Sequence, residues 1–226
     1  MEPFFHSIQP RHLTDEALDE LLALGWFRMQ QSVFTCSHLE HEALYRVHWL
    51  RFSLAALTEG SGLRRIRRRN QRFGFTIAPV TTIGEAHRDL HGRYRASITF
   101  DGAESIESCL FGEMPAGASI FTTHCISVVD GDRLIASGYF DTGVTAAASI
   151  LHFFDPDYAR YSLGKYLILL TLDFLRKNNF AFYYPGYVVA GEPKMNYKLF
   201  LGAEAATYFQ PETLSWQPFD IRILQH

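Results

Sequence analysis

The chain has 226 residues, of which 47% are hydrophobic and 20% are charged, and its formal net charge is −3. This composition is typical of a globular protein that buries roughly 70% of its unfolded surface, and it excludes a general basic field, so any nucleic-acid contact depends on a local patch. Three widely separated cysteines exclude a disulfide framework, and without a signal-peptide pattern or an apolar run of about 18 residues we expect a cytoplasmic protein.

The N-terminal part predicts one helix followed by short strands. Thr14 is a suitable N-cap for a helix over residues 14–24, and Gly25 stands just past its end. Apolar and alternating segments then predict strands at 26–28, 32–34 and 45–52.

A dense arginine run follows a loop at residues 58–62. Its six arginines, between positions 64 and 72, are too many for one helical face, so some point to solvent or to a partner. A solvated basic helix is one interpretation. The other is a phosphate-binding segment, because each guanidinium is a planar and always charged donor. In that case the candidate contacts are Arg64, Arg67, Arg68 and Arg69.

The middle of the chain carries the clearest sheet signal. A strand is expected over 73–78 and a helix over 83–98, whereas residues 102–118 follow no regular pattern. Asp130-Gly131-Asp132 is a hairpin turn signature between strands at 119–129 and 133–140, and a third strand is expected at 146–154.

Residues 149–198 form the stretch around which the rest is organised. A β-branched and aromatic strand ends at Asp155-Pro156, a turn with Ser162, Leu163 and Gly164 opens a helix that runs to Arg176, and a second strand covers 180–184. Free backbone N–H groups at such a helix start favour an anion. Simple helix capping is the alternative interpretation of this turn.

This order of elements resembles the core of GNAT-type acyltransferases. In that fold the turn receives the pyrophosphate of acyl-CoA through a Gln/Arg-x-x-Gly-x-Gly/Ala pattern. Here the matching segment, from Arg160 to Tyr166, has a single glycine and bulky neighbours, which argues against ordinary acyl-CoA use. We therefore expect an α/β (α+β) fold in which helices flank a mixed, mostly antiparallel sheet.

Four motifs resemble the C-terminal domain of the aminoacyl-tRNA–protein transferases, which are the arginyltransferases and the bacterial aspartate/glutamate leucyltransferases. They are Phe154-Asp-Pro-Asp-Tyr158, Ser162-Leu-Gly164, Tyr184-Pro-Gly-Tyr187 and Lys194-Met-Asn-Tyr-Lys198. The N-terminal half is similar more loosely, through Gly25-Trp-Phe-Arg28, Val33-Phe34 and Arg68-Arg-Asn70. The resemblance implies an N-terminal subdomain over residues 1–78 and a GNAT-like catalytic domain over 79–226.

One departure from that family lies at Cys36. The family commonly has a Cys-x-x-Cys-x-x-Cys motif there, whereas this chain has Cys36, Leu39 and Glu42. Cys36, His38 and His41 are weak candidates for a metal site, and we expect no cofactor. The missing cysteines leave open whether the acceptor is a protein that begins with Asp or Glu.

The resemblance implies transfer of leucine or arginine from aminoacyl-tRNA to the N-terminal α-amine of a protein or peptide, as in N-degron protein degradation. Tyr187, Asn196, Tyr197 and Lys198 are the expected pocket residues, and Arg160, Ser162, Leu163 and Gly164 lie where the tRNA end is expected. Core packing of the tyrosines and solvation of Lys198 are the structural alternatives. The expected partners exclude DNA and membranes. An acyl-CoA-dependent acetyltransferase and a non-catalytic tRNA-binding relative remain open as other functions.

Overall fold

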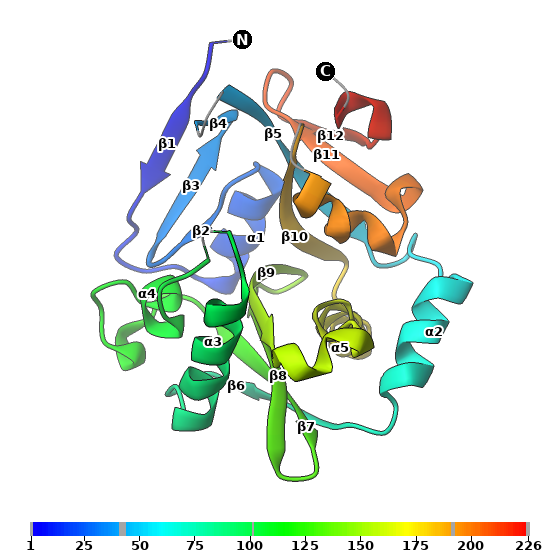
Figure 1. The fold of residues 1–226 in the computed structure, drawn as a ribbon. Helices are drawn as coiled ribbons and strands as arrows, with labels where there is room; N and C mark the ends of the chain where they lie inside the picture. The colour runs from blue at the N-terminus through cyan, green and yellow to red at the C-terminus, as the bar shows by residue number, and fades with distance from the viewer. Residues whose placement is uncertain (1, 41–43, 101, 191–192, 225–226) are drawn as a thin grey trace.

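The computed structural model describes residues 2–40, 44–100, 102–190 and 193–224, and a large mixed sheet runs through its centre (Figure 1). The strand order is β12-β11-β5-β10-β9-β8-β7-β6, and β4 pairs beside β5. Its strands are β4 (His38–Glu40), β5 (Leu44–Ser53), β6 (Gly74–Pro79), β7 (Thr123–Asp130), β8 (Arg133–Thr142), β9 (Ala146–Phe154), β10 (Phe182–Val189), β11 (Ala206–Gln210) and β12 (Ser215–Pro218). All neighbouring pairs are antiparallel except β9 and β10, which are parallel. The expected mixed, mostly antiparallel sheet with flanking helices is confirmed.

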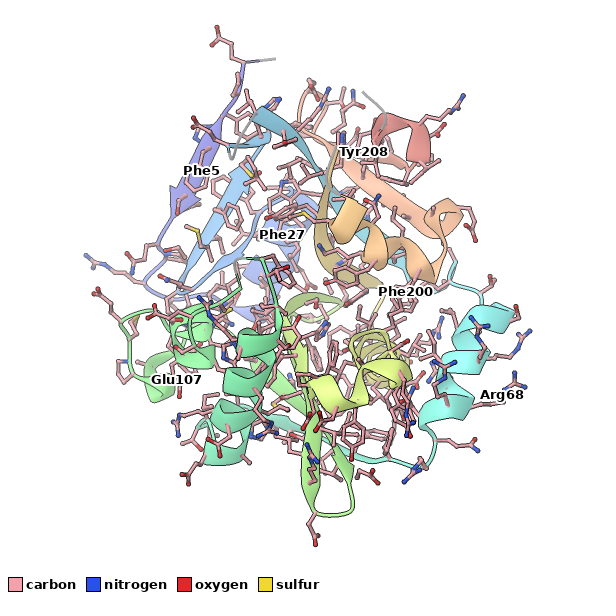
Figure 2. The ribbon with its side chains drawn as sticks, viewed as in Figure 1. Phe5, Phe27, Arg68, Glu107, Phe200 and Tyr208 are labelled. Carbon is pink, nitrogen blue, oxygen red and sulfur yellow. The ribbon has the colours of Figure 1, made fainter. Side chains whose placement is uncertain are left out.

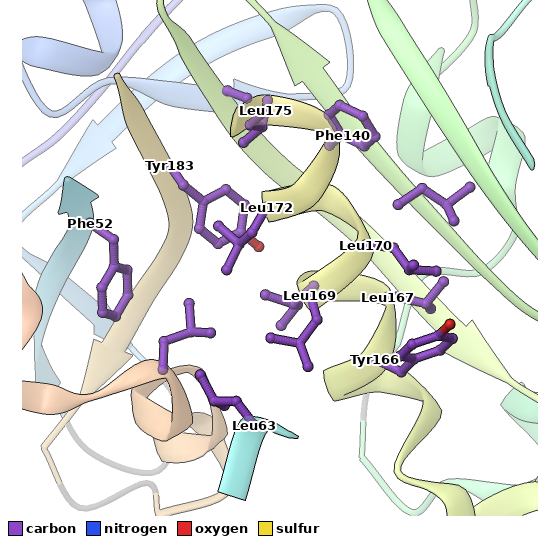
Figure 3. Close-up of a cluster of buried hydrophobic side chains, with 14 of the residues drawn as sticks. Phe52, Leu63, Phe140, Tyr166, Leu167, Leu169, Leu170, Leu172, Leu175 and Tyr183 are labelled. Carbon is purple, nitrogen blue, oxygen red and sulfur yellow. The ribbon is translucent and has the colours of Figure 1, made fainter. Parts of the chain in front are cut away.

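The main core lies between one face of this sheet and helix α5 (Leu163–Lys177) (Figure 3). Leu167, Leu170 and Leu175 of α5 are almost completely buried there. Apolar residues cover most of the circumference of α5, not one stripe. They are buried because two further elements, α2 (Ser61–Asn70) and the 3₁₀ segment η3 (Pro193–Leu201), cover the sides of α5 that the sheet leaves free.

The other face of the sheet carries the remaining helices. Helix α3 (Glu85–Ser97) packs on β8 and β9, and the short helix α4 (Ile106–Leu110) contacts β9. Helix α1 (Asp15–Ala23) begins at Thr14, whose hydroxyl accepts a hydrogen bond from the N–H of Ala17. The predicted cap is therefore confirmed. The described helices include none long and apolar enough to span a membrane.

A separate three-stranded sheet, in the order β1-β3-β2, packs near α1. Its strands are β1 (Phe5–Ile8), β2 (Phe27–Met29) and β3 (Ser32–Cys36). Arg28 of β2 reaches the large sheet, where its Nη1 donates to Asp141 Oδ1 at 2.7 Å and to Thr123 Oγ1 at 2.9 Å. Both charged side chains are almost fully buried, so this pair fixes the small sheet against the large one.

The parallel pair β9–β10 separates part of the way along its length. Hydrogen-bonded pairing stops at Tyr184 and Ala148, although both strands continue. Each strand is irregular at this point, because β9 has an extra residue opposite β8 and β10 has a bulge that ends at Gly186. The two strands therefore splay apart next to the start of α5.

One region differs from the sequence-based expectations. Residues 106–110 form helix α4 inside the segment that was expected to be irregular, where Ser105 and Ser108 make a reciprocal cap that the apolar pattern did not reveal. The expected domain boundary after residue 78 stays a prediction. Strands β4 and β5 on its N-terminal side, and β6, which runs across it, hydrogen-bond within the large sheet.

We expect Arg28→Met to lower the free energy of unfolding by about 3–5 kcal/mol, because it leaves Asp141 buried and charged without its cation. Urea denaturation measures this loss. Arg46→Met is the matched control, because Arg46 pairs with Glu212 at the surface and its removal should cost less than about 1 kcal/mol. A loss no larger than that of the control would contradict a structural role for the buried pair.

Candidate active site

A pocket of about 380 Å³ opens where α2, the start of α5 and the end of η3 meet. Three basic side chains line it, Arg65, Arg69 and Lys165, together with one carboxylate, Glu204. Apolar side chains form the rest of the wall, at Leu63, Ile66, Phe200 and Leu201. The pocket thus combines positive charge with an aromatic surface.

The start of α5 forms one side of the pocket. Ser162 has a left-handed backbone (φ 57°, ψ 44°), and its side chain caps no helix N–H. The first helical hydrogen bond is donated by Tyr166 to the Ser162 carbonyl, so the N–H groups of residues 163–165 have no partner within the helix. Side-chain capping therefore does not account for this turn, and the helix start is open to an anion.

The residue that needs the unusual backbone here is Ser162, not Gly164. A Cβ atom added to Gly164 would meet the ring of Phe154 at 3.8 Å, an ordinary contact. A non-glycine residue in the left-handed region costs about 1 kcal/mol or more, and such strain is concentrated at functional sites. Leu163, another predicted residue, is fully buried in the core, so only its backbone faces the turn.

The arginine run is divided between the pocket and structural contacts. Of the four predicted arginines only Arg69 lines the pocket, and its Nη1 also donates to the Arg160 carbonyl at 2.6 Å. Arg67 pairs instead with Glu59 and with Asp173 of α5. Arg64 donates to the Glu59 carbonyl, and Figure 2 shows Arg68 at the outer side of α2, pointing away from the rest of the molecule.

Arg65 and Lys165 line the pocket but were not among the predicted site residues. Arg65 stands four residues before Arg69, so in a helix the two share one face. The sequence spacing predicts that Arg65 and Arg69 share a face of α2. Which face of α2 lines the pocket depends on how α2 packs on α5. Lys165 follows Gly164 directly, and its Nζ lies 5.3 Å from the centre of the Phe200 ring. Arg160 lies at the edge of this region, with its Nη2 3.1 Å from the Tyr161 hydroxyl.

The four predicted pocket residues of the C-terminal segment lie together, on β10 and η3. Lys198 Nζ donates to the Tyr187 carbonyl at 2.9 Å and lies 5.1 Å from the centre of the Tyr197 ring. The side chains of these four residues do not line the pocket described above, although Phe200 and Leu201 at the end of η3 do. The glycine turn and η3 therefore border one pocket, while Lys198 points into the splay between β9 and β10.

Burial sets the protonation of this group. It lowers the pKa of Lys198 to about 8, so part of the amine is neutral near pH 7.5. Burial raises the pKa of Tyr187, so its hydroxyl keeps its proton and can donate. The pKa of Tyr197 is also raised by desolvation, although 45% of this residue is exposed, so its hydroxyl is protonated at neutral pH as well. An amine that titrates near neutral pH beside protonated phenols is suited to acid–base work.

The candidate metal ligands do not form a cluster within the described part of the chain. Cys36 is buried in β3, and burial raises the pKa of its thiol to about 11, which keeps it protonated. His38 Nδ1 lies 2.9 Å from the Ser37 hydroxyl, and His41 lies outside the described residues. In the structure Cys36 acts as a core residue.

A family model described as "Arginine-tRNA-protein transferase, C terminus" matches residues 86–206, more than half of the chain. The chain belongs to this family. The match runs from α3 to the start of β11, so it includes α5 and η3 but not the arginines of α2. It confirms the family and the enzyme class that the four motifs predicted, an aminoacyl-tRNA–protein transferase.

Individual relatives agree with this assignment. The transferase is 29% identical over 193 residues to an aspartate/glutamate leucyltransferase of Acinetobacter baumannii, covering 84% of this chain and 70% of the relative. The enzyme of the same name from Shewanella sp. (strain MR-4) is 29% identical over 196 residues, covering 84% of this chain and 78% of the relative. The arginyl-tRNA–protein transferase 1 of Saccharomyces cerevisiae is 40% identical over 72 residues, which is 32% of this chain and 14% of that one.

Solved structures resemble this transferase more distantly. The crystal structure of FemX matches with a TM-score of 0.44 and 9% identity, covering 83% of this chain and 64% of FemX. The C-terminal domain of a lysylphosphatidylglycerol synthetase from Agrobacterium fabrum matches with a TM-score of 0.47 and 14% identity, covering 63% of this chain and 48% of that one. The matched part is therefore about half of that solved chain.

The lowered pKa of Lys198 predicts a pH-dependent stability. Well below pH 8 the amine is charged in both the folded and the unfolded chain, so the folded chain bears the full free-energy cost of burying a charged amine. Between about 8 and the ordinary value of 10.5 the folded chain has released a proton that the unfolded chain still binds, so stability rises with pH. We expect the free energy of unfolding of the native chain to rise relative to that of Lys198→Met, by at most about 3 kcal/mol.

Urea unfolding at intervals from pH 7 to 10 measures this difference. Lys177→Met, at an exposed position at the end of α5, is the control for loss of a lysine at the surface. A difference between the native chain and Lys198→Met that does not change over this range would contradict burial of the Lys198 amine.

Proposed function

We propose that this transferase moves an amino acid from aminoacyl-tRNA to the N-terminal α-amine of a protein or peptide and so forms a peptide bond. One observation carries the proposal. Arg65, Arg69 and Lys165 meet the open start of α5 in a single pocket that η3 also borders.

The pocket suits the single-stranded 3′ end of a tRNA. Two arginines and a lysine can neutralise phosphates. The unpartnered backbone N–H groups of residues 163–165 add hydrogen-bond donors for the phosphate oxygens. Phe200 also lines the pocket and adds an aromatic ring, the type of side chain on which bases stack. The net charge of −3 does not oppose this binding, because three of the cations line one pocket. Arg64, Arg67, Arg68 and Arg160 were also predicted to bind tRNA, but they do not line the pocket, and this proposal gives them no direct contact with the phosphates.

The chemistry needs little beyond positioning, because the ester of aminoacyl-tRNA is already activated. The acceptor amine attacks the ester carbonyl, a tetrahedral oxyanion forms, and the ribose oxygen leaves. Lys198 and Tyr197 of η3 supply hydrogen-bond donors, and Asn196 of the same segment supplies an amide. No covalent nucleophile is required, and we propose the reaction for the cytoplasm, where charged tRNA is available.

The donor and the acceptor define the specificity of the proposed reaction. The relatives are named for leucine and for arginine, so both are candidate donors. The leucyltransferases are named for aspartate and glutamate, and acceptors that begin with these residues are the first to test. Because Cys36 is the one cysteine at the N-terminal motif, a different acceptor, such as a small peptide, belongs in the same test.

The experiment that tests the proposal is a transfer assay. The protein is incubated with tRNA charged with labelled leucine or labelled arginine, and with peptides that begin with Asp, Glu, Arg or Lys. Labelled peptide with either donor supports the proposal and identifies the pair. Retention of charged tRNA without any product would favour a non-catalytic binding protein, and a thermal shift with acetyl-CoA but not with charged tRNA would favour an acyl-CoA enzyme.

The pocket itself predicts the effect of charge reversal. We expect Arg65→Glu/Arg69→Glu to weaken tRNA binding and to lower the dependence of log Kd on log salt by roughly one for each lost phosphate contact. Filter binding over a salt series measures both. The control is Arg11→Glu/Lys177→Glu, which changes the net charge equally but at residues that do not line the pocket. Equal losses in the two variants would contradict a specific phosphate site.

A further inference from the structure

A cluster of polar side chains lies between α3 and the sheet, on the face opposite α5. Its centre is Cys125 of β7, which packs against the core under α3, whereas the next residue, Ile126, is buried in the core under α5. His87 comes from α3, and Ser127 and Ser137 come from β7 and β8. Three elements thus bring together one thiol, one imidazole and two hydroxyls, and the proposed transfer of an amino acid uses none of them.

These groups are all within hydrogen-bond reach of the Cys125 sulfur. Its Sγ lies 3.3 Å from Ser137 Oγ, 3.7 Å from His87 Nε2 and 3.8 Å from Ser127 Oγ. His87 Nε2 is also 2.9 Å from Ser127 Oγ. Tyr139 of β8 is the register partner of Cys125, and burial together with the neighbouring thiol raises the pKa of its phenol, which therefore stays protonated. A base and several hydroxyl groups thus surround one sulfur atom.

The cluster is open to solvent on one side. Cys125, His87 and Ser127 are half-buried. Strand β6, at the edge of the sheet, places only the short side chains of Ala78 beside Cys125 and Thr76 beside Ser127, and both are exposed. A small reagent can therefore approach the sulfur over this edge.

The other two cysteines have no comparable surroundings. Burial raises the pKa of the Cys36 thiol to about 11, and it also raises the pKa of the Cys109 thiol. Both thiols are therefore protonated at neutral pH and unreactive, because the thiolate is the nucleophilic form of cysteine. All three cysteines are free.

The cluster can generate and stabilise a thiolate. Burial lowers the pKa of His87, so its imidazole is neutral at pH 7 and Nε2 can accept the proton of the Cys125 thiol. The resulting Nε2–H can donate to Ser127 Oγ, and the Ser137 hydroxyl can donate to the negative sulfur. Reactive cysteines in other proteins have this combination of partial exposure and a neighbouring base.

We propose that Cys125 is a site of covalent modification by small disulfides, with His87 as the base that forms its thiolate. The thiolate attacks one sulfur of the disulfide, a new bond forms between that sulfur and Sγ, and the S–S bond of the reagent breaks. The other half leaves as a thiolate and takes the proton from His87. Cys125 is oxidised and the disulfide is reduced, so no further oxidant is required.

This inference does not depend on the proposed transfer reaction. The phosphate pocket is formed by α2, the start of α5 and the end of η3, whereas Cys125 faces α3 on the other side of the sheet. A mixed disulfide at Cys125 therefore leaves the phosphate pocket unoccupied, and its formation is measured without tRNA.

The first test follows the reaction of the native chain with the chromogenic disulfide dithiobis(nitrobenzoate). We expect one thiol per chain to react at least tenfold faster than the other two. Cys125→Ser should remove this fast phase, and Cys109→Ser, the matched control, should keep it. Absence of a fast phase, or a fast phase that persists in Cys125→Ser, would overturn the inference.

The role of His87 is tested by the sign of a rate change. If the ring only covered the sulfur, His87→Ala would expose Cys125 and accelerate its reaction. As the base, its loss should slow the reaction by about tenfold at pH 7, because only a few per cent of an ordinary thiol is ionised there. An unchanged or faster reaction would contradict this role.

His91→Ala is the control for general loosening of α3. His91 lies one turn further along α3 and packs against Phe153, and we expect its loss to leave the rate within about twofold of the native value. A loss equal to that in His87→Ala would assign the effect to helix packing and overturn the proposed base.

A further measurement uses only the native chain and so does not depend on the folding of a variant. The protein is incubated with oxidised glutathione, and the modified residue is identified by peptide mapping with mass spectrometry. A mixed disulfide at Cys125 supports the inference, whereas modification at Cys36 or Cys109 instead, or none at all, would overturn it.

Discussion

The fold depends on one topological constraint, the parallel pairing of β9 with β10 in an otherwise antiparallel sheet. Parallel neighbours cannot be joined by a tight hairpin, so the chain must cross over one face of the sheet, and α5 makes that connection. The crossover places the start of α5 next to the end of β9. The partial charge of the helix start, the splay of the two strands and the core beneath α5 therefore all follow from a single strand pair.

The pocket is built from segments that are far apart in the sequence, and ion pairs hold them in place. Arg67 forms an ion pair with Asp173 of α5 and so holds α2 against α5, while Arg65 and Arg69 line the pocket. On the opposite side, η3 is anchored by the bond from Lys198 to the Tyr187 carbonyl. Within one arginine run some side chains form structural ion pairs and others line the pocket, so a protein with a small net negative charge can have a cationic pocket.

Local signals predicted much of this architecture. Thr14 as a cap, the Asp130-Gly131-Asp132 hairpin and the strand–turn–helix–strand unit are all present, because each depends on residues close in sequence. The roles of single arginines could not be predicted, since Arg65 and Arg67 differ only in what α5 places against them. The residues of the candidate site remain predictions, whereas the family and the mixed sheet are confirmed.

The position of β5 in the sheet has a consequence for synthesis of the chain. This strand is made early, but both of its main neighbours, β10 and β11, begin more than a hundred residues later. The meander from β6 to β9, in contrast, is joined mostly by near neighbours in sequence and can assemble on its own while the ribosome continues. On a translating ribosome most of β5, apart from the three residues that pair with β4, therefore lacks its hydrogen-bonded neighbours until the last third of the polypeptide has emerged.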